Sequence, residues 1–518
     1  MNSHPIKSLI LLAVSMLVFV ACNSKPDNLQ LIPEDANLVV TADLRSMAIK
    51  ASLSDVMKMP LFETLDKELR AENRNLSMLM DDLKKNPTST GITFDDGLAY
   101  WLMIRNEKEL YQCMSMSLSS RKKFEKTART LFSNLTPENK VFLSEDIYFM
   151  KSGWNSMIAW DNEKAVVISA ISPYSEVKMK KALAAMFKSE KNIIDNADYN
   201  RFMKKKEDIS LWVNMDVINK VPELKQVYEQ MGDEYFDYFN DTYFHAHLTF
   251  EKDKINFDFE LKPGEQLKAL YEKEMYLKKF NQNLLKKLPS GNYVSMSFAL
   301  NMPLYYDVMM KTNMQLSSLD SLFTVSTGVE LKPLMESLNG SVVMSLYDFN
   351  PMPRLAIVFD LNNNNLMKKL MEKIPNYMTN GEIQIIKAGE MAFYIYCGKD
   401  FCIAANDESL IQSAALGENV SPALFDNKTG KNMAENPVYM NIDLNFNQYP
   451  GFIADQLRAP GTASITLNMI DSYASNLEIK SIDSYHTNMI LNTENKNKNS
   501  LFSLISLINE YYQQFTNL

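Results

Sequence analysis

The chain has 518 residues, of which 46% are hydrophobic and 23% are charged, a composition typical of globular proteins and a length that suits two or more domains. Its net charge of −9 argues against binding to nucleic acid or to anionic membrane surfaces, because both need clustered Lys and Arg. The 15 glycines leave few places for glycine-rich phosphate loops.

The N-terminus has the pattern of a bacterial lipoprotein signal. Lys7 precedes an uncharged apolar run over residues 8–20, which suits a signal peptide and is too short to span a bilayer. Ala21 and Cys22 follow where cleavage is expected. We therefore expect removal of residues 1–21 and lipidation of Cys22, since several acyl chains on one residue anchor a protein stably. An ordinary secretory signal with a chance cysteine is the alternative.

Residues 22–30 are polar and are expected to form a tether. Asp does not follow Cys22 directly, and in many bacteria an Asp there retains a lipoprotein in the inner membrane. We expect a lipid-anchored protein of the bacterial cell envelope, in the outer membrane, facing either the periplasm or the cell surface.

From residue 31 onward, apolar strands alternate with amphipathic helices. Helices are predicted over residues 122–131 and 176–187, the second capped by Ser175. Tight polar turns, such as the one at residues 161–164, favour antiparallel strand pairing. Strands are predicted over residues 38–44, 99–104, 111–118, 156–160, 165–170 and 211–217. The pattern predicts the α+β class.

The two halves of the sequence can be aligned in order along their whole length. The paired segments are residues 31–44 with 287–300, 89–92 with 326–329, 161–164 with 398–400, 213–217 with 440–444, and 243–280 with 476–514. We predict two tandem homologous repeats, residues 31–277 and 278–518, each an antiparallel sheet covered by helices.

These features together resemble a Bacteroidota lipoprotein family of unknown function. The resemblance rests on the lipoprotein signal, on the segment from Ile32 to Leu44 and on Thr90-Gly91-Ile92. It implies a source phylum, and it supplies neither an activity nor catalytic residues.

His245 and His247 alternate on one face of an expected strand and could form half of a metal site. A third ligand is not near them in sequence, so a partly exposed strand face is the favoured interpretation, and we expect no metal and no cofactor. Cys397 and Cys402 flank Gly398-Lys399-Asp400-Phe401. If these four residues form a hairpin loop, the cysteines face each other and could form a disulfide in the envelope, but buried thiols are the favoured interpretation.

The sequence contains no Gly-x-Ser-x-Gly, His-Glu-x-x-His or Walker motif, and we expect a protein that is not an enzyme. The favoured hypothesis is a binding module for an envelope protein or for a small ligand in a cleft between the repeats. A glycan-binding accessory lipoprotein is the first alternative. It would need exposed aromatic side chains, but all of the tryptophans (Trp101, Trp154, Trp160 and Trp212) are expected to be buried. A carboxylate-dependent hydrolase is the second alternative.

Overall fold

The computed structural model describes residues 27–516 apart from residues 73–80, 82–86, 94–95, 107–108, 133–139, 172–174, 206, 221–238, 274–276, 313, 350–351, 374–376, 389–390, 447–448 and 450–461. Helices and antiparallel strands are mixed along the chain, which confirms the predicted α+β class. Of the helices in these ranges, none combines the length and the apolar character needed to cross a membrane.

The chain forms two compact units. The first unit comprises Met1–Val227, Phe239–Gly264 and Asn495–Leu518, and the second unit comprises Tyr228–Tyr238 and Glu265–Glu494. The predicted second domain, residues 278–518, therefore differs at its C-terminal end. There, α20 (Ser500–Thr516) packs on α4 (Pro60–Glu72) of the first unit, and the side chain of Asn509 accepts a 3.0 Å hydrogen bond from the backbone N–H of Leu61. A contact across this sequence distance leaves no local signal in either segment.

The predicted tether is also shorter than expected. Asp27–Leu31 forms the 3-10 helix η1, in which Asn28 and Leu29 are buried. The side-chain amide of Asn28 donates to the carbonyl of Gly97 at 3.3 Å, and the hydroxyl of Ser115 donates to the carbonyl of Asn28 at 3.1 Å. The prediction of a tether over residues 22–30 is wrong for residues 27–30 because these side chains find apolar and hydrogen-bonding partners on the sheet.

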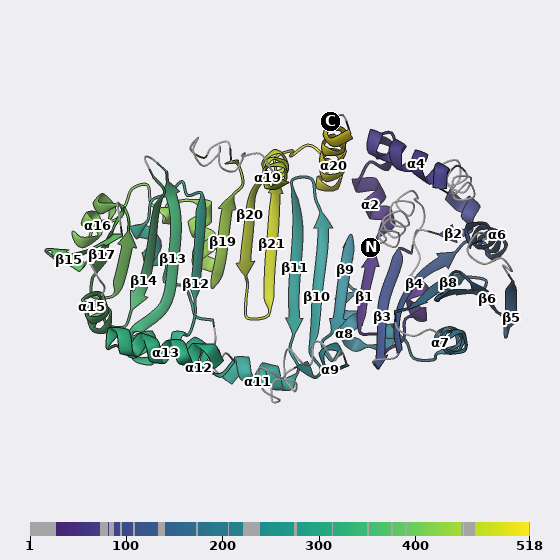
Figure 1. Cartoon of the computed structure of the whole chain (residues 1–518), viewed down its shortest axis with the longest axis horizontal. Coiled ribbons are helices and arrows are strands. Elements are labelled where there is room, and N and C mark those ends of the chain that lie inside the picture. Colours follow the sequence, from purple (N-terminus) through teal and green to yellow (C-terminus); the bar gives the residue numbers. More distant parts are fainter. Residues whose placement is uncertain are drawn as a thin grey trace. The chain divides into compact units, whose positions relative to one another are not determined.

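The first unit is built on one antiparallel sheet. Its strands are β1 (Leu38–Ala42), β2 (Ile92–Thr93), β3 (Leu98–Asn106), β4 (Glu109–Leu118), β5 (Val141–Ser144), β6 (Ile147–Lys151), β7 (Ser156–Trp160), β8 (Lys164–Ala170), β9 (Ile209–Asn214), β10 (Tyr243–Phe250) and β11 (Lys254–Lys262). Their order is β11-β10-β9-β1-β3-β4-β8-β7-β6-β5, with the short β2 beside β4 (Figure 1). Successive side chains of a strand point to opposite faces, so a row of alternate residues faces the helices.

The two predicted helices of the first unit are confirmed as α6 (Arg121–Phe132) and α7 (Glu176–Lys188). The hydroxyl of Ser175 caps α7 by accepting a 3.3 Å hydrogen bond from the backbone N–H of Lys178. The remaining helices described in this unit are α2 (Leu44–Lys50), α3 (Leu53–Val56), α4, α8 (Ala197–Phe202), α9 (Val217–Lys220) and α20.

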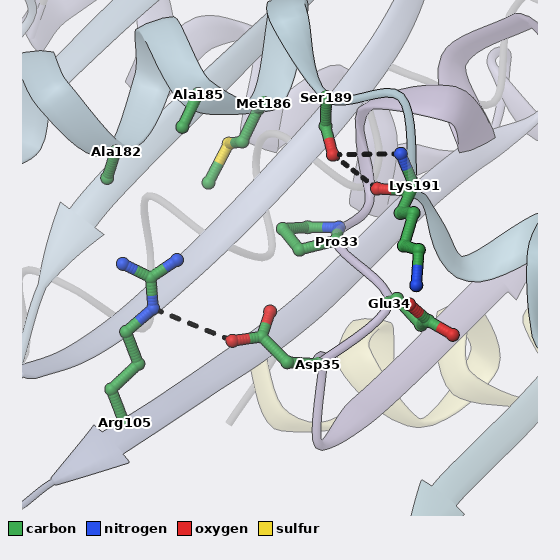
Figure 2. A pocket seen from close by; sticks show the side chains of 9 residues that line it. All are labelled: Pro33, Glu34, Asp35, Arg105, Ala182, Ala185, Met186, Ser189 and Lys191. Carbon is green, nitrogen blue, oxygen red and sulfur yellow. Dashed lines mark hydrogen bonds and ion pairs between the residues drawn. The ribbon is translucent and has the colours of Figure 1, made fainter.

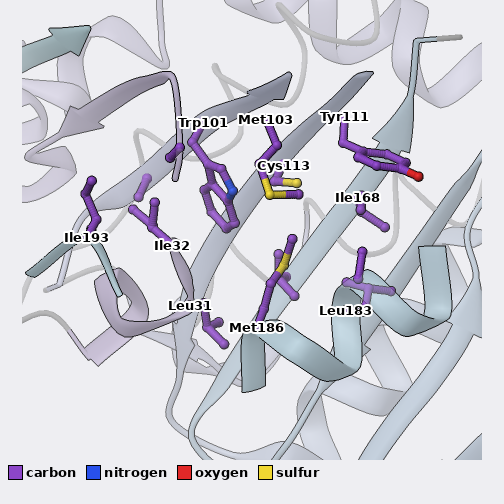
Figure 3. Packing of buried hydrophobic residues seen from close by; sticks show 14 of the residues in the cluster. Leu31, Ile32, Trp101, Met103, Tyr111, Cys113, Ile168, Leu183, Met186 and Ile193 are labelled. Carbon is purple, nitrogen blue, oxygen red and sulfur yellow. The ribbon is translucent and has the colours of Figure 1, made fainter. Parts of the chain in front are cut away.

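The main core of the first unit lies between the sheet and α7 (Figure 3). This core includes Trp101 and Met103 of β3, Ile168 of β8, and Leu183 and Met186 of α7, all of them buried. Burying a large apolar side chain contributes about 1.5–3 kcal/mol, so this cluster fixes α7 on the sheet. The loops at the ends of β3 and α7 are thereby held in place.

The second unit is likewise built on antiparallel strands. Its strands are β12 (Val294–Ala299), β13 (Leu338–Asp348), β14 (Arg354–Leu361), β15 (Tyr377–Asn380), β16 (Ile383–Ala388), β17 (Met391–Cys397), β18 (Phe401–Ala405), β19 (Val438–Asp443), β20 (Ala474–Ser481) and β21 (His486–Thr493). Their order is β21-β20-β19-β12-β13-β14-β18-β17-β16-β15, and every neighbouring pair is antiparallel (Figure 1). Matched in chain order, these strands have the same arrangement as those of the first unit.

Helices of the second unit cover this sheet and extend along one of its ends. Those described are α11 (Glu265–Lys273), α12 (Met302–Thr312), α13 (Met314–Thr327), α14 (Leu331–Ser337), α15 (Asn365–Met371), α16 (Glu408–Ala415), α17 (Lys428–Glu435) and α19 (Thr462–Tyr473). Both α12 and α14 pack against β13.

Candidate functional site

A pocket of about 400 Å³ opens in the first unit beside the segment Pro33-Glu34-Asp35, within the motif singled out in the sequence (Figure 2). This volume lies in the usual range for small-molecule sites, about 300–1,000 Å³. Its lining residues are Pro33, Glu34, Asp35, Arg105, Ala182, Ala185, Met186, Ser189 and Lys191. Apolar groups of α7 therefore form one wall, and charged groups stand opposite it.

The backbone around the pocket is fixed by hydrogen bonds between segments that are far apart in the sequence. The N–H of Ile193 donates to the carbonyl of Ile32 at 2.8 Å, and Pro33 forms an isolated β-bridge with Asn192. The backbone N–H of Asn192 in turn donates to the Asp195 carboxylate at 2.9 Å. The motif and the chain segment after α7 are thus held side by side, which brings their charged side chains to one opening.

Charges of both signs meet at this pocket. Arg105 Nε lies 3.7 Å from Asp35 Oδ2, and the two side chains are 41% and 57% exposed. Exposed ion pairs of this kind contribute only about 0–1 kcal/mol, so both groups can exchange partners at little cost. Glu34 and Lys191 are exposed as well. The arrangement suits a small ligand that has both a positive and a negative group.

His245 and His247 are buried, with 1% and 7% exposure, so the interpretation of a partly exposed strand face is wrong. They lie under α8, where the ring of Phe202 is 4.6 Å and 4.4 Å from their ring centroids. His245 Nε2 is 2.8 Å from Asp198 Oδ2, and His247 Nδ1 is 3.0 Å from Ser210 Oγ. Among the described residues, no group of three His, Cys, Asp or Glu side chains could hold a metal ion.

The pKa values around these histidines indicate a structural role. Burial alone would raise the pKa of Asp198, but hydrogen bonds from His245, Lys262 and Trp212 outweigh it and lower that pKa. Burial lowers the pKa of His247 to about 4. A general base works best with a pKa near neutral pH, so this imidazole is poorly suited to activate the neighbouring hydroxyl. The cluster ties α8 to β9 and β10.

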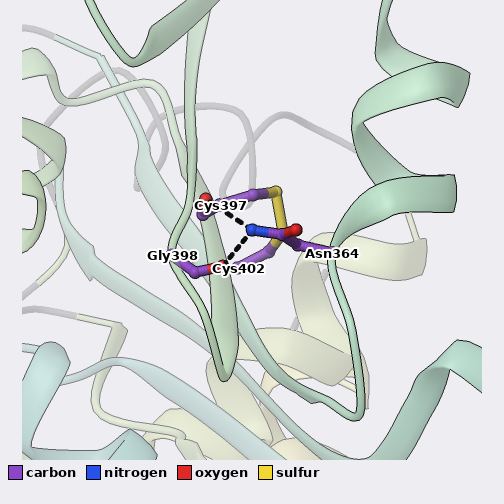
Figure 4. Close-up of a disulfide and its surroundings, with 4 residues drawn as sticks. All are labelled: Asn364, Cys397, Gly398 and Cys402. Carbon is purple, nitrogen blue, oxygen red and sulfur yellow. Dashed lines mark hydrogen bonds between the residues drawn. A yellow bond between two sulfur atoms is a disulfide. The ribbon is translucent and has the colours of Figure 1, made fainter.

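Cys397 and Cys402 are direct partners in the register of β17 and β18, and they form a disulfide (Figure 4). The N–H of Gly398 donates to the carbonyl of Phe401 at 2.9 Å and closes the hairpin. The side-chain amide of Asn364 donates to the carbonyl of Gly398 at 2.6 Å. The predicted lipidation site, Cys22, lies outside the described residues.

Three of the tryptophans, Trp101, Trp160 and Trp212, are fully buried, as expected. Trp154 differs, because 77% of its side chain is exposed in the turn between β6 and β7. Its expected burial is wrong, because the two strands end before the turn and the ring lies in the connecting segment, outside the packed faces of the sheet.

The fold and the pocket define a two-unit α+β protein in which one unit has an open, mixed-charge pocket. The chain belongs to the family described as Domain of unknown function (DUF4836), which it matches over residues 28–501. No curated protein matches the chain.

Two solved structures are similar to part of the chain. Crystal form I of TP0453 has 10% identity and a TM-score of 0.27, and covers 49% of this chain and 86% of the other. Crystal form III of TP0453 has 12% identity and the same TM-score of 0.27, and covers 48% and 86%. A TM-score this low does not define a shared fold.

Proposed function

We propose that the protein is a lipid-anchored, non-catalytic binding module of the bacterial envelope, and that its first-unit pocket holds a small ligand with charges of both signs. The observation behind this proposal is the placement of Arg105 and Lys191 with Glu34 and Asp35 around one opening. Opposite charges spaced around an apolar wall complement a zwitterion such as an amino acid or a dipeptide. A ligand that carries a single charge would be repelled by the pocket side chains of the same sign.

We also propose that the two units arose by internal duplication, as the sequence alignment suggested. Matching backbone hydrogen bonds support this: Ile193 N–H donates to Ile32 in the first unit, and Leu424 N–H donates to Leu288 in the second, both at 2.8 Å. The isolated bridge between Pro33 and Asn192 likewise has a counterpart between Pro289 and Ala423. The shared strand order supports the same origin.

For the anchor, we propose a lipid on Cys22 and an outer-membrane location. With η1 beginning at Asp27, only residues 23–26 would separate the lipid from the folded unit. So short a linker keeps the first unit close to the membrane surface, because an extended residue spans at most ~3.6 Å.

Isothermal titration calorimetry of the whole chain with zwitterionic dipeptides tests the pocket. We expect these to bind, and N-acetylated, C-amidated counterparts to bind at least about tenfold more weakly, since charge-assisted hydrogen bonds are lost. Arg105→Gln and Glu34→Gln should each weaken the binding of the zwitterionic dipeptides. Arg129→Gln is the matched control, because Arg129 pairs with Glu125 on α6 outside the pocket. Equal binding of free and blocked dipeptides, or unaffected variants, would contradict the proposal.

A protein partner is the second proposal for the same module. A crosslinking pull-down of the natively lipidated protein, identified by mass spectrometry, should recover a stoichiometric envelope protein that is missing with Cys22→Ala. Recovery of the chain alone counts against the partner.

The glycan-binding alternative has one specific observation in its favour, the exposed ring of Trp154. Aromatic rings that stack on sugars need such exposure. If glycan binding is the function, Trp154→Ala should abolish retention on a polysaccharide affinity gel, whereas retention unchanged by the substitution rules this ring out.

A further inference from the structure

We propose that the second unit contains a binding site for a small organic cation, an amine attached to an aromatic or aliphatic body, in a pocket between α12, α13 and α14. This site goes beyond the proposed function, since it lies in the other unit and takes a different class of ligand. Its volume is about 470 Å³, which suits a small molecule.

Aromatic and thioether side chains dominate the walls of this pocket. Tyr305, Tyr306 and Met309 come from α12, Phe323 from α13 and Met335 from α14. The rings supply faces that attract a cation, and the methionines adapt to apolar bodies of different shape. Such walls favour an apolar ligand, and they would accept a cation held near the rings.

The carboxylate of Asp320, which lines the pocket, indicates which end of the ligand is charged. Asp320 Oδ2 accepts a 3.0 Å hydrogen bond from the hydroxyl of Tyr306. Its other oxygen, Oδ1, is buried and has no hydrogen-bond partner within the described part of the chain. Leaving a buried acceptor unpaired costs about 1–3 kcal/mol, and more for a charged group. An ammonium placed in the pocket beside the Asp320 carboxylate would offset its negative charge.

The charges around the pocket favour a cation over an anion. Asp307 on α12 and Glu330 before α14 both act on the Tyr306 hydroxyl, whose pKa is raised by burial first and then by these carboxylates and Asp320. Lys332 is paired with Asp307 at 2.9 Å and so offsets only one of these negative charges. An anionic ligand would be repelled, and a neutral apolar ligand would leave the charge of Asp320 without a counter-charge in the pocket.

Calorimetric titration of the whole chain with phenethylamine and hexylamine, against 2-phenylethanol and hexanol as neutral counterparts, tests the proposal. We expect each amine to bind about tenfold or more tightly than its alcohol, because only the amine forms a charge-assisted hydrogen bond. Asp320→Asn retains an acceptor for Tyr306 and should reduce amine binding to the level of the alcohol. Asp483→Asn, at an exposed aspartate in the turn between β20 and β21 and outside the pocket, is the matched control.

Equal binding of amines and alcohols, or no binding of either amine at millimolar concentration, overturns the proposal. Circular dichroism confirms that Asp320→Asn is folded. Met335→Trp gives a second reading, because a larger side chain in the pocket should exclude amines and alcohols alike. Arg105→Gln should leave amine binding unchanged, so failure of the first-unit pocket and failure of this site are distinguishable.

Discussion

Matching positions of the two units have different side chains on the same backbone. In the first unit Pro33 is followed by Glu34 and Asp35, and in the second Pro289 is followed by Ser290 and Gly291. Both prolines form an isolated bridge, so the backbone path is shared while the charges are not. The mixed-charge pocket is therefore a property of the side chains of one unit and not of the backbone path.

The hairpins between β7 and β8 and between β17 and β18 show a second difference. Trp160 and Ala165 are paired across the first hairpin, and Cys397 and Cys402 are paired at the matching place in the second. Trp160 packs against the ring of Phe124 at 5.7 Å. One unit thus fixes its hairpin by apolar burial, and the other by a covalent bond.

Replacing Trp160 should produce the largest change. Trp160→Ala is expected to cost about 3–5 kcal/mol of stability, since it leaves a cavity in a packed core. Cys402→Ser should cost only ~2 kcal/mol, because the disulfide closes a short loop. Calorimetric unfolding of each variant checks this, and a larger loss for Cys402→Ser would reverse the comparison.

The carboxylate of Asp198 should come next. Asp198→Asn leaves the positive charge of Lys262 and the imidazole of His245 without their buried anion, at an expected cost of about 3 kcal/mol. The second-unit variant Glu478→Gln should cost less than about 1 kcal/mol, since its partner Lys428 is 83% exposed. Urea unfolding followed by fluorescence measures both. Similar costs for the two variants would show that the buried Asp198 cluster stabilises its unit no more than the Glu478–Lys428 pair stabilises the second unit.

The glycines of the two Thr-Gly segments provide a smaller contrast. Gly91 and Gly328 have φ of 77° and 66°, and in each segment the threonine hydroxyl accepts a 3.2 Å hydrogen bond from the residue after the glycine. A Cβ at Gly91 would lie 2.4 Å from the backbone N of Phe124, whereas Gly328 has open space. Gly91→Ala is expected to cost roughly 3 kcal/mol and Gly328→Ala roughly 1 kcal/mol in thermal unfolding. Equal losses of stability would mean that the positive φ, and not the close contact at Gly91, determines the effect of the substitution.

The pH dependence of stability should be smaller than the effect of Trp160→Ala, Asp198→Asn or Gly91→Ala. The pKa of His247 is about 4 in the folded unit, below the ordinary value of about 6.5. The unfolded chain therefore binds a proton that the folded chain does not, and stability that is full above pH ~6.5 falls as the pH drops toward 4, by on the order of 2 kcal/mol. His247→Gln should remove this change in the free energy of unfolding with pH, as measured in urea titrations. Lys480→Gln, at the matching place in β20, should not.

Local patterns predicted α6, α7 and the Ser175 cap because those signals lie within a few residues of one another. The partner of His245 could not be predicted, because Asp198 lies 47 residues away and meets it only through the packing of α8. The exposure of Trp154 depends on where two strands stop, which alternation alone does not define.

One pair of aligned segments differs by two residues from the register of the strands. Asn214 N–H donates to Asn37 and Asp443 N–H donates to Tyr293, so Asn214 is the counterpart of Asp443, whereas the sequence alignment placed Asp216 there. A shift of two residues keeps each side chain on the same face of the strand, and the apolar pattern cannot detect it.

Native mass spectrometry of the protein purified from its own envelope would test the binding function most directly. We expect a small molecule to be bound to the wild-type chain and to be missing from the Arg105→Gln, Lys191→Gln double variant, with the Arg129→Gln control unchanged. A ligand retained in full by the double variant, or a wild-type chain that has no ligand and binds none of the zwitterions, would contradict this expectation.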